Sequence, residues 1–491
     1  MVKQIQTDVV IIGGGVIGTL AARELSRYKL DVWLVEKDAE VGWGATKANS
    51  GIVHAGFHDK PGSEKAKYCV EGNALYPELC DELDVSFEQN GILMVARSPE
   101  EIPVLEQYRA QGQKNGVPGL RIVYQDELRE LEPNLSASTT AALLAPTGGT
   151  VAPFELAAAA MENAVDNGVQ LLAESPVEAI QREDDGFIVM TPNGNLKTRF
   201  IVNAAGLHSD TIARLFNDTS FTITPRKGEE YLFDKSIRVV NHTIFPVPNA
   251  VSKGILVIPT SEGNVMIGPT GDNVDARDDM TTTQDGFKRI FDSVHELVPS
   301  LSPSGIITQF AGVRAASDRG DFVIDYSPVS KQIVHLAGIE SPGLTAAPAI
   351  ALQCAALLKE AGLDLVPDPT FCGRRRPVVR FHRLPRTEQA ALIEHNPSFG
   401  KIVCRCETVT EAEIVDAIQR GARTIDGVKF RVRAGAGRCQ GGFCQPLVMQ
   451  ILSRELGIPL TAVTKRGGGS EQVLYQAKEL VGRQTRENII S

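Results

Sequence analysis

The chain has 491 residues, a formal net charge of −10 and 43% hydrophobic residues. Its length predicts two or three domains, since single hydrophobic cores stop growing near ~250–300 residues. The acidic balance argues against nonspecific nucleic-acid binding, which depends on lysine and arginine neutralising phosphates. The sequence has no run of about twenty apolar residues and no apolar signal-peptide region at its N-terminus, so we expect a soluble, cytoplasmic protein.

The first predicted unit is a strand, turn, helix and second strand of the kind that binds dinucleotides. A buried strand over residues 9–12 and an amphipathic helix over 19–27 enclose a G-x-G-x-x-G turn, and a strand over 32–35 ends in Glu36. The glycines of that turn are Gly13, Gly15 and Gly18. They permit close approach to a pyrophosphate, the helix N-terminus attracts its charge, and Glu36 can accept hydrogen bonds from an adenosine ribose. The same acid repels a 2′-phosphate, which disfavours NADP.

The middle of the chain has a different pattern. Residues about 220–325 carry short alternating strands punctuated by glycine and proline, which predicts a mixed or antiparallel sheet. Strand ends near 201–206 and 333–338, the second followed by a helix to Leu358, return to the pattern of the N-terminus. We therefore expect an α/β fold class, in which a Rossmann-like nucleotide-binding domain is interrupted by a mixed-sheet or antiparallel-sheet substrate domain.

The domain boundaries follow from these patterns. The nucleotide-binding parts are expected at about 1–90, 145–215 and 326–370, and the substrate-domain parts at about 91–144 and 216–325. A linker over 371–399, a small α-rich module over 400–455 and a C-terminal extension over 456–491 complete the chain. The linker is rich in proline and arginine, and its arginines at 374–376 could dock an acidic partner, although a solvated linker is the simpler interpretation.

The small module contains two close pairs of cysteines, a pattern typical of a thiolate-bound inorganic cofactor. The pairs are Cys404 with Cys406 and Cys439 with Cys444. Structural zinc also takes four thiolates, usually from pairs spaced two to four residues apart. Glycines around Cys439 and Cys444 allow backbone N–H groups to donate to cluster sulfurs, which favours an iron–sulfur cluster over zinc. The other four cysteines lie in apolar or helical patterns and are interpreted as inert thiols.

The choice between FAD and NAD depends on the rest of the chain, because both fit the N-terminal unit. A nicotinamide enzyme with a flavin would need a second such unit, and the later glycine clusters do not lie between a buried strand and a helix. With one nucleotide site and one cluster, the economical assignment is FAD, which takes two electrons from a substrate and passes them singly to iron–sulfur.

Several segments resemble known families. They are the N-terminal fingerprint, Ala48–Gly56, Val202–Gly206, Arg226–Glu229, Ala311–Arg314 and Gly338–Thr345. On these segments, residues 8 to about 365 resemble the FAD-dependent family that includes D-amino-acid oxidase, glycerol-3-phosphate dehydrogenase and L-2-hydroxyglutarate dehydrogenase. The cysteine module resembles the bacterioferritin-associated-ferredoxin-like domain, which carries a 2Fe-2S cluster, as found at the C-terminus of the anaerobic glycerol-3-phosphate dehydrogenase catalytic subunit.

The resemblance implies two sets of binding residues. The cluster ligands are expected to be Cys404, Cys406, Cys439 and Cys444. The FAD-binding residues are expected to be Gly13, Gly15, Gly18, Glu36, Lys37, Thr46, Asn49, Ser50, Gly51, Val177, Ala205, Gly206, Gly338, Gly343, Leu344 and Thr345. Backbone N–H groups of the segment that ends at Thr345 could face the flavin, with a purely structural turn as the alternative.

Four residues are candidates for the substrate chemistry. His54 lies on the segment that runs beside the isoalloxazine ring in the family, and an imidazole can accept a hydroxyl proton near pH 7. The alternative for His54 is simple packing against the ring. Arg314 has apolar neighbours and suits a bidentate carboxylate or phosphate. Lys227 is the next candidate cation and Arg319 the third, and for both an ordinary ion pair with a neighbouring carboxylate is an equal alternative.

The predicted function is a dehydrogenase of a small anionic alcohol. The cluster module favours sn-glycerol 3-phosphate, oxidised to dihydroxyacetone phosphate. The segment Ser341–Thr345 departs from the Gly-Gly-Lys-x-Thr-Tyr-Arg pattern of glycerol-3-phosphate dehydrogenases and resembles the L-2-hydroxyglutarate enzymes, so that acid, another 2-hydroxy acid or an amino acid is the alternative. An electron-relay subunit without its own substrate is a third interpretation, against which His54 and Arg314 argue. We expect the acceptor to be a partner flavoprotein or electron carrier, which could also bring the chain to a membrane.

Overall fold

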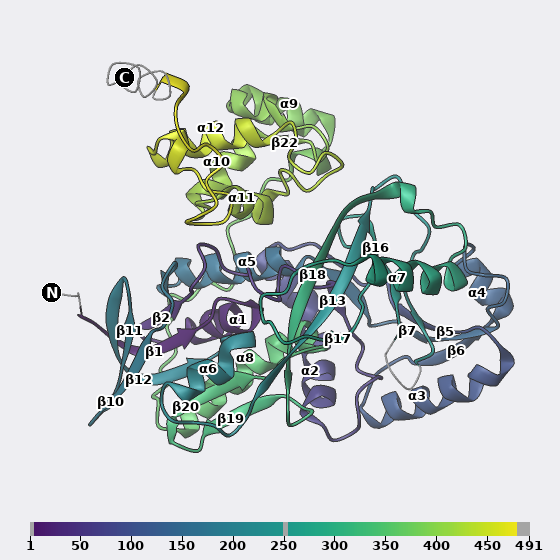
Figure 1. Ribbon diagram of the computed structural model, residues 1–491, viewed down its shortest axis with the longest axis horizontal. Helices are drawn as coiled ribbons and strands as arrows, with labels where there is room; N and C mark the ends of the chain where they lie inside the picture. Colours follow the sequence, from purple (N-terminus) through teal and green to yellow (C-terminus); the bar gives the residue numbers. More distant parts are fainter. Residues whose placement is uncertain (1–3, 249–253, 479–491) are drawn as a thin grey trace, which may run out of the picture. The chain divides into compact units, whose positions relative to one another are not determined.

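The computed structural model describes residues 4–248 and 254–478, and the chain divides into two compact units. Unit 1 consists of residues 1–37 and 41–376, and unit 2 of residues 38–40 and 377–491. Figure 1 shows the ribbon of both units and labels many of their elements. Within the described ranges, no helix is both long enough and apolar enough to cross a membrane.

The first sheet of unit 1 has a parallel centre. Its strands are β1 (Gln4–Ile12), β2 (Val32–Val35), β9 (Gln170–Leu172), β10 (Ala179–Glu183), β11 (Gly186–Thr191), β12 (Gly194–Asn203), β19 (Val323–Ser327) and β20 (Ser330–Ala337). They run in the order β10-β11-β12-β1-β2-β9, with β20 pairing both β12 and β19. The pairs of β1 with β12 and β2, of β2 with β9 and of β12 with β20 are parallel, as expected for a Rossmann-like domain.

Helices cover this sheet because its central strand is apolar on both faces. Val9 and Ile11 of β1 share one core with α1 and α8, whereas Val10 and Ile12 share another with β10, β11 and α6. The helices around the sheet are α1 (Val16–Leu25), α2 (Glu64–Leu83), α5 (Pro153–Asp166), α6 (Ser209–Arg214) and α8 (Gly343–Glu360). α1 packs against both α5 and α8 (Figure 1).

The second sheet of unit 1 is mixed, as the sequence predicts. Its strands are β5 (Ile92–Ala96), β6 (Arg121–Tyr124), β7 (Ala141–Ala145), β13 (Ile223–Phe233), β14 (Thr243–Pro246), β15 (Leu256–Pro259), β16 (Val265–Gly268), β17 (Asp272–Asn273) and β18 (Ile306–Ser317). They run in the order β17-β13-β16-β15-β14-β5-β7-β6, and β18 pairs with β13. β14 and β5 are parallel, and the remaining pairs are antiparallel.

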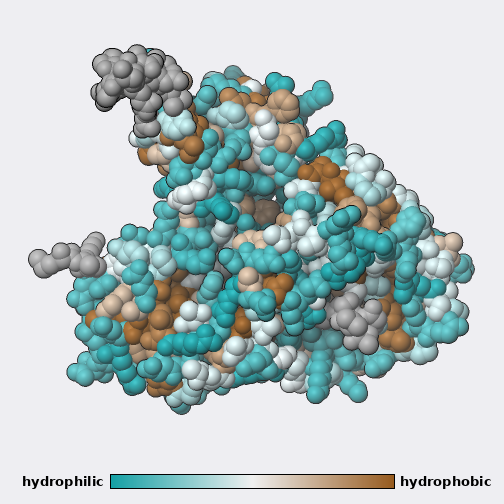
Figure 2. Space-filling view, viewed as in Figure 1, coloured by the Kyte–Doolittle hydropathy of each residue, from teal (hydrophilic) through white to brown (hydrophobic). Residues whose placement is uncertain are grey.

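Three helices and a small third sheet complete unit 1. The helices that accompany the mixed sheet are α3 (Ile102–Lys114), α4 (Gln125–Leu131) and α7 (Gln284–Leu297). The small sheet has the order β3 (Ile52–Val53), β8 (Gly149–Val151) and β4 (Phe87–Glu88). In the view of Figure 2, hydrophilic residues cover most of the surface, and hydrophobic residues lie in scattered groups between them.

Unit 2 is small and mainly helical. Its elements are α9 (Arg386–His395), β21 (Ile402–Cys404), β22 (Val409–Thr410), α10 (Glu411–Gln419), α11 (Ile425–Val432) and α12 (Gln445–Leu456). Thr410 begins α10 with a capping box, in which its side chain accepts from Glu413 N and the Glu413 carboxylate accepts from Thr410 N. A core that includes Val403, Ile414, Val428 and Leu452 holds the elements together.

The segment expected as a linker is more ordered than its composition suggests. Residues 377–399 fold with unit 2 and contain α9. The arginines before it bind carboxylates of unit 1: Arg374 pairs with Asp81 at 2.8 Å, and buried Arg375 pairs with Glu162 at 2.6 Å. Arg376 lies 3.5 Å from Asp166. These arginines therefore fasten the chain to unit 1, which disfavours the interpretation that they dock an acidic partner.

Candidate active site and cluster site

The glycine turn between β1 and α1 is packed where the nucleotide motif needs close contact. Gly13 has φ +110°, and a Cβ there would lie 2.5 Å from Ala204 O. A Cβ on Gly18 would lie 1.9 Å from Gly13 O, so that glycine lets α1 approach the turn. At Gly15 the nearest atom to such a Cβ is Thr46 Oγ1 at 3.4 Å, and the first turn of α1 has no acidic residue. This less crowded helix N-terminus fits a pyrophosphate.

Residues beside the turn hold it in place. Glu36 Oε2 accepts from Gly14 N at 2.6 Å, which sets the carboxylate against the turn at the end of β2. Thr46 Oγ1 accepts from Val16 N at 3.0 Å and so satisfies one N–H group of the first turn of α1. Lys37 is exposed immediately after Glu36. The expected ribose-binding and pyrophosphate-binding residues thus lie around one helix N-terminus.

A second group of expected FAD residues forms the loop before β3. Asn49 Oδ1 accepts from Gly51 N at 2.8 Å, and Gly51 has φ +73°. A Cβ on Gly51 would lie 2.5 Å from Val151 O, so both the positive φ and this close approach require glycine there. The Ser50 hydroxyl donates to Glu230 Oε1 on β13, a contact that joins this loop to the mixed sheet.

The structure fixes the backbone of His54 from two elements. His54 N donates to Thr345 Oγ1 at 2.8 Å, and His54 O accepts from Asn73 Nδ2 at 3.0 Å. The imidazole Nε2 lies 3.4 Å from Ser341 Oγ, and the ring lies edge-on to Phe245 with centroids 5.9 Å apart. His54 is therefore half-buried and held against the turn between β20 and α8, another segment expected beside the flavin.

That turn is held by contacts with α2 and the β3 strand. Leu344 O accepts from Tyr76 Oη at 2.6 Å, and the Thr345 hydroxyl lies 3.4 Å from Ile52 O. A Cβ on Gly343 would lie 2.4 Å from Ile339 Cγ2, and one on Gly338 would lie 2.6 Å from Ser317 Cβ. The side chain of Thr345 thus joins chain segments, which supports the structural-turn alternative for that hydroxyl.

The remaining expected FAD residues lie at the carboxyl end of β12 and before β10. Ala205 N lies 3.4 Å from Asn203 Oδ1, and Ala205 O accepts from His208 N. Gly206 is exposed with φ +54° and open space around its Cα. Val177 is half-buried against the core that contains Val10 and Ile12. These positions lie at the strand ends where open α/β sheets bind ligands.

The two faces of β13 carry different chemistry. Arg226 pairs in register with Arg314 of β18, and Gly228 pairs with Gly312. Because side chains alternate along a strand, Arg226, Gly228 and Glu230 share one face, and Arg314 lies on the same side. Lys227 lies on the opposite face.

Lys227 was expected to help hold the substrate anion, but its side chain is committed to an ion pair. Its Nζ lies 2.9 Å from Asp279 Oδ2 and 3.3 Å from Thr281 Oγ1. Arg314 Nη2 instead donates to Thr270 O at 2.7 Å, and burial followed by the charge of Arg226 lowers the Arg314 pKa. The structure therefore favours the ion-pair alternative for Lys227. Sequence reasoning missed Arg226, which the register places opposite Arg314.

Glu230 is a second residue that the sequence did not single out. Its side chain is buried between the Ser50 loop and β13, and a Cβ on Gly268 would lie 2.9 Å from its Cγ. Burial raises the Glu230 pKa to about 7, while the Ser50 hydrogen bond and the charge of Arg314 act in the opposite direction. The face that carries Arg314 therefore also holds a carboxyl that titrates near neutral pH.

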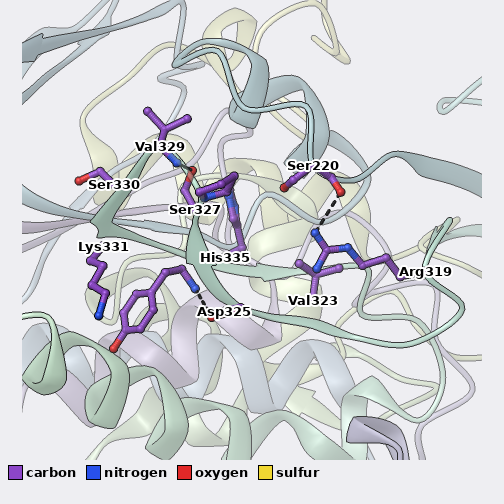
Figure 3. A pocket seen from close by; sticks show the side chains of 11 residues that line it. Ser220, Arg319, Val323, Asp325, Ser327, Val329, Ser330, Lys331 and His335 are labelled. Carbon is purple, nitrogen blue, oxygen red and sulfur yellow. Dashed lines mark hydrogen bonds between the residues drawn. The ribbon is translucent and has the colours of Figure 1, made fainter.

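Arg319, the third candidate cation, lines a cavity beside β19 and β20. Figure 3 shows this cavity of about 610 Å³ beside β19 and β20, with Arg319 Nη2 donating to Ser220 O at 3.0 Å. At its edge His335 Nε2 lies 2.9 Å from Asp218, and burial lowers the His335 pKa. Ser327 also donates to Asp218, at 2.5 Å. This network satisfies its own members, and apart from Arg319 none of the expected FAD or substrate residues lines the cavity.

The four paired cysteines come together in unit 2. Cys404 ends β21 and is buried, Cys444 is buried at the start of α12, and Cys406 is exposed. The thiols of Cys404 and Cys444 share a hydrogen bond, as do those of Cys406 and Cys439. Residues 400–455 therefore contain two facing pairs, each with one member from either end of the module.

Backbone donors surround these sulfurs. The hydrogen bond with Cys444, followed by N–H groups that include those of Gly435 and Glu407, lowers the Cys404 pKa to about 6, although burial opposes the shift. N–H groups of Phe443 and Gly441 lower the Cys439 pKa. The pKa values of Cys406 and Cys444 are raised, that of Cys444 chiefly by its hydrogen bond with Cys404, so each facing pair contains one thiol that ionises more readily than the other. The backbone donors agree with the expectation that the glycine-rich loops supply donors to cluster sulfurs.

The arrangement of the thiols fits two irons. Structural zinc needs four ligands around a single centre, whereas a 2Fe-2S cluster takes two thiolates on each iron. Close approach of the loops also depends on glycine, since a Cβ on Gly437 would lie 2.5 Å from Cys406 Cβ.

Comparisons with known proteins show two family matches, one for each part of the chain. The FAD dependent oxidoreductase family matches residues 8–357, and the BFD-like [2Fe-2S] binding domain matches residues 402–454. A glycerol 3-phosphate dehydrogenase of Caloramator mitchellensis is 43% identical over 466 residues, which are 94% of this chain and 97% of that protein. An L-2-hydroxyglutarate dehydrogenase of Indibacter alkaliphilus is 29% identical and covers 70% of this chain and 96% of its own length.

A solved structure has a similar fold over about three quarters of this chain. A dithionite-reduced L-α-glycerophosphate oxidase from Mycoplasma pneumoniae with FAD bound superposes with a TM-score of 0.73 and 31% identity, over 76% of this chain and all of that one. The cofactors are accordingly FAD and a 2Fe-2S cluster. The chain belongs to the FAD dependent oxidoreductase family, as a dehydrogenase that carries a BFD-like [2Fe-2S] binding domain in the same polypeptide.

Proposed function

We propose that the chain oxidises sn-glycerol 3-phosphate to dihydroxyacetone phosphate and passes the electrons through its 2Fe-2S cluster to a partner protein. The observation that carries this proposal is the similarity to the Caloramator glycerol 3-phosphate dehydrogenase, which extends across both units. L-2-hydroxyglutarate is the second candidate substrate, because the Ser341–Thr345 segment resembles the enzymes that act on it.

The proposed cofactor ligands lie in the two sites described above. Gly13, Gly15 and Gly18 with the N-terminus of α1 would hold the FAD pyrophosphate, and Glu36 would bind the ribose. The four cysteines of unit 2 would hold the cluster. When bound, FAD accepts two electrons from the substrate carbon and the cluster carries electrons one at a time.

The proposed substrate contacts come from residues around the face of β13 that carries Arg314. The Arg314 guanidinium would bind the anionic end of the substrate, a task that suits its planar donors. His54 would accept the hydroxyl proton at Nε2, the nitrogen that lies 3.4 Å from Ser341 Oγ. The bonds from Thr345 and Asn73 would hold the His54 backbone while the proton moves.

An anaerobic titration tests the substrate. Glycerol 3-phosphate added to the purified holoenzyme is expected to bleach the FAD absorbance at lower concentration than L-2-hydroxyglutarate. Bleaching by L-2-hydroxyglutarate alone would transfer the assignment to the second candidate. No bleaching by any anionic alcohol, 2-hydroxy acid or amino acid would favour an electron-relay subunit, since a relay receives its electrons from another protein.

A further inference from the structure

Two guanidinium groups face each other across the antiparallel pair β13 and β18. Arg226 and Arg314 are register partners, so their Cβ atoms lie on the same face of the sheet. This face also holds the Glu230 carboxyl, which the Ser50 loop contacts. Arg226 therefore lies beside the residue proposed to bind the substrate anion, although the sequence drew attention to its neighbour Lys227.

The ends of both arginines meet near Gly271. A Cβ on Gly271 would lie 3.4 Å from Arg226 Nη2 and 3.7 Å from Arg314 Nη2, and one on Gly228 would lie 3.0 Å from Arg314 Nη2. Glycine at these positions thus leaves room where the two guanidinium groups come together. A small anion there would contact donors from both strands.

The protein itself does little to neutralise this pair. The Arg226 side chain forms no hydrogen bond or ion pair within residues 4–248 and 254–478, and its Nε is buried without a partner. Arg314 donates to the neutral carbonyl of Thr270, while Glu340, Glu230 and Asp272 act on it only through their electric fields. Burying like charges without a counter-ion is unfavourable. A bound anion would relieve that repulsion.

We propose that Arg226 and Arg314 form a two-arginine clamp for the phosphate group, which makes Arg226 a specificity-determining residue for a dianionic substrate. The inference rests on the proposed function and deepens it. A phosphate monoester carries close to two negative charges at neutral pH and offers three oxygens, so it can bind both guanidinium groups. A single carboxylate has one charge and two oxygens, and it satisfies one guanidinium in a bidentate pair.

Thermal unfolding of the holoenzyme tests the clamp without turnover. Sulfate, a dianion of similar shape, is expected to raise the melting temperature of the parent, whereas acetate raises it less at equal ionic strength. Arg226→Gln is expected to melt higher than the parent without anions, because one of two repelling charges is gone, and to weaken sulfate binding about 10- to 100-fold. Arg226→Lys keeps a point charge, so its sulfate affinity is expected to lie between those of the parent and Arg226→Gln.

Arg289→Gln is the matched control. Arg289 is an exposed residue paired with Asp272 on the neighbouring β17, so its loss changes the local charge by the same amount without removing either guanidinium group of the clamp. This control should respond to sulfate like the parent. An equal sulfate response in the parent and in Arg226→Gln would overturn the proposal, as would an equal loss of response in Arg289→Gln.

Glycerol 3-phosphate separates failure of the clamp from failure of the proposed function. If this substrate bleaches FAD in the parent and Arg226→Gln raises its half-saturating concentration about 10- to 100-fold, both ideas stand. If it bleaches FAD in the parent and Arg226→Gln with the same concentration dependence, the clamp is wrong and the proposed function survives. If it fails to bleach FAD while sulfate stabilises the parent and not Arg226→Gln, the clamp survives and the substrate assignment falls.

Discussion

The two faces of β13 share one backbone but differ in whether their charged side chains have partners. On one face Lys227 pairs with Asp279, and the Glu229 carboxylate accepts from Thr283 N and Oγ1 at 2.8 and 2.9 Å. On the other face the Arg226 side chain lacks a hydrogen-bond or ion-pair partner in the described ranges, and Glu230 is a buried carboxyl with a raised pKa. The charged side chains on the first face therefore have ion-pair or hydrogen-bond partners. On the second face, the Arg226 side chain has none among the described residues.

This difference indicates where the strand serves stability and where it serves binding. Buried charges that are paired and hydrogen-bonded belong to the structure, and removing one partner mainly affects folding. Groups with perturbed pKa values and unsatisfied donors cluster at functional sites, where a ligand completes their interactions. On the proposed function, the Arg226 and Glu230 face would bind the substrate and the Lys227 face would stabilise the fold.

The largest effect expected on the substrate side comes from His54. His54→Ala should slow anaerobic FAD reduction by glycerol 3-phosphate by roughly 10²–10⁴-fold, the usual contribution of a general base, and flatten the acidic limb of the pH–rate profile. His295→Ala on the exposed surface of α7 is the control and should keep the parent rate. A parent-like rate in His54→Ala would leave this histidine as a packing residue.

Glu230 gives a pH-dependent stability. Its pKa is raised from 4.5 to about 7 in the folded protein, so the folded state keeps a proton that the unfolded chain loses as pH rises between these values. The parent should lose stability across that window, by at most about 3 kcal/mol from this group. Glu230→Gln should match the parent near pH 4.5 and be more stable above pH 7, measured by urea unfolding. Parallel curves for parent and variant would show that the site does not perturb this carboxyl.

Arg314 should affect binding without affecting the cofactor. Arg314→Ala is expected to weaken glycerol 3-phosphate by about 1.5–3 kcal/mol, the range for hydrogen bonds to a charged group, and to retain FAD after gel filtration. Arg121→Ala removes an exposed arginine that pairs with Glu127 and should leave substrate affinity unchanged. Release of FAD from Arg314→Ala would mark this residue as a support of the flavin site instead.

The smallest functional effect is expected on the opposite face of the strand. Lys227→Met should lower stability by about 1 kcal/mol, because Asp279 is part-exposed and its loss of a partner is only partly costly. The half-saturating concentration of glycerol 3-phosphate should stay at the parent value. A tenfold rise in that concentration with unchanged stability would remove the distinction between the two faces of β13.

The sequence predicted the parts of the molecule that depend on local patterns. The sequence predicts the turn at Gly13 from the glycine spacing, the mixed sheet from alternating burial, and the cluster site from the cysteine pairs, because each of these patterns lies within a short segment. The sequence does not predict the role of Arg226, since that role depends on which residue of β18 lies opposite it. The alternation of side chains along a strand could have identified Arg226. Tyr231 and Phe233 belong to a hydrophobic core and Lys227 lies on their face, so Arg226 lies on the other face.

The contacts of the segment expected as a linker could not be predicted from its composition. Proline and arginine at 373–386 suggested a solvated connection, but tertiary contacts override composition there. Arg375 is buried against Glu162, and α9 follows with residues that fold as part of unit 2. A single sequence does not reveal which distant carboxylate a charged side chain meets.

One anaerobic experiment tests the central claim, that glycerol 3-phosphate is oxidised in unit 1 and the electrons leave through the cysteines of unit 2. Glycerol 3-phosphate is mixed with the parent, with Cys439→Ser and with Cys372→Ser, which changes an exposed cysteine outside the cluster site. Absorbance follows FAD, and electron paramagnetic resonance follows reduced iron. The account predicts FAD bleaching at one rate in all three proteins, with a reduced-iron signal in the parent and Cys372→Ser but not in Cys439→Ser. Absence of bleaching in the parent, or a bleached flavin without reduced iron there, would contradict it.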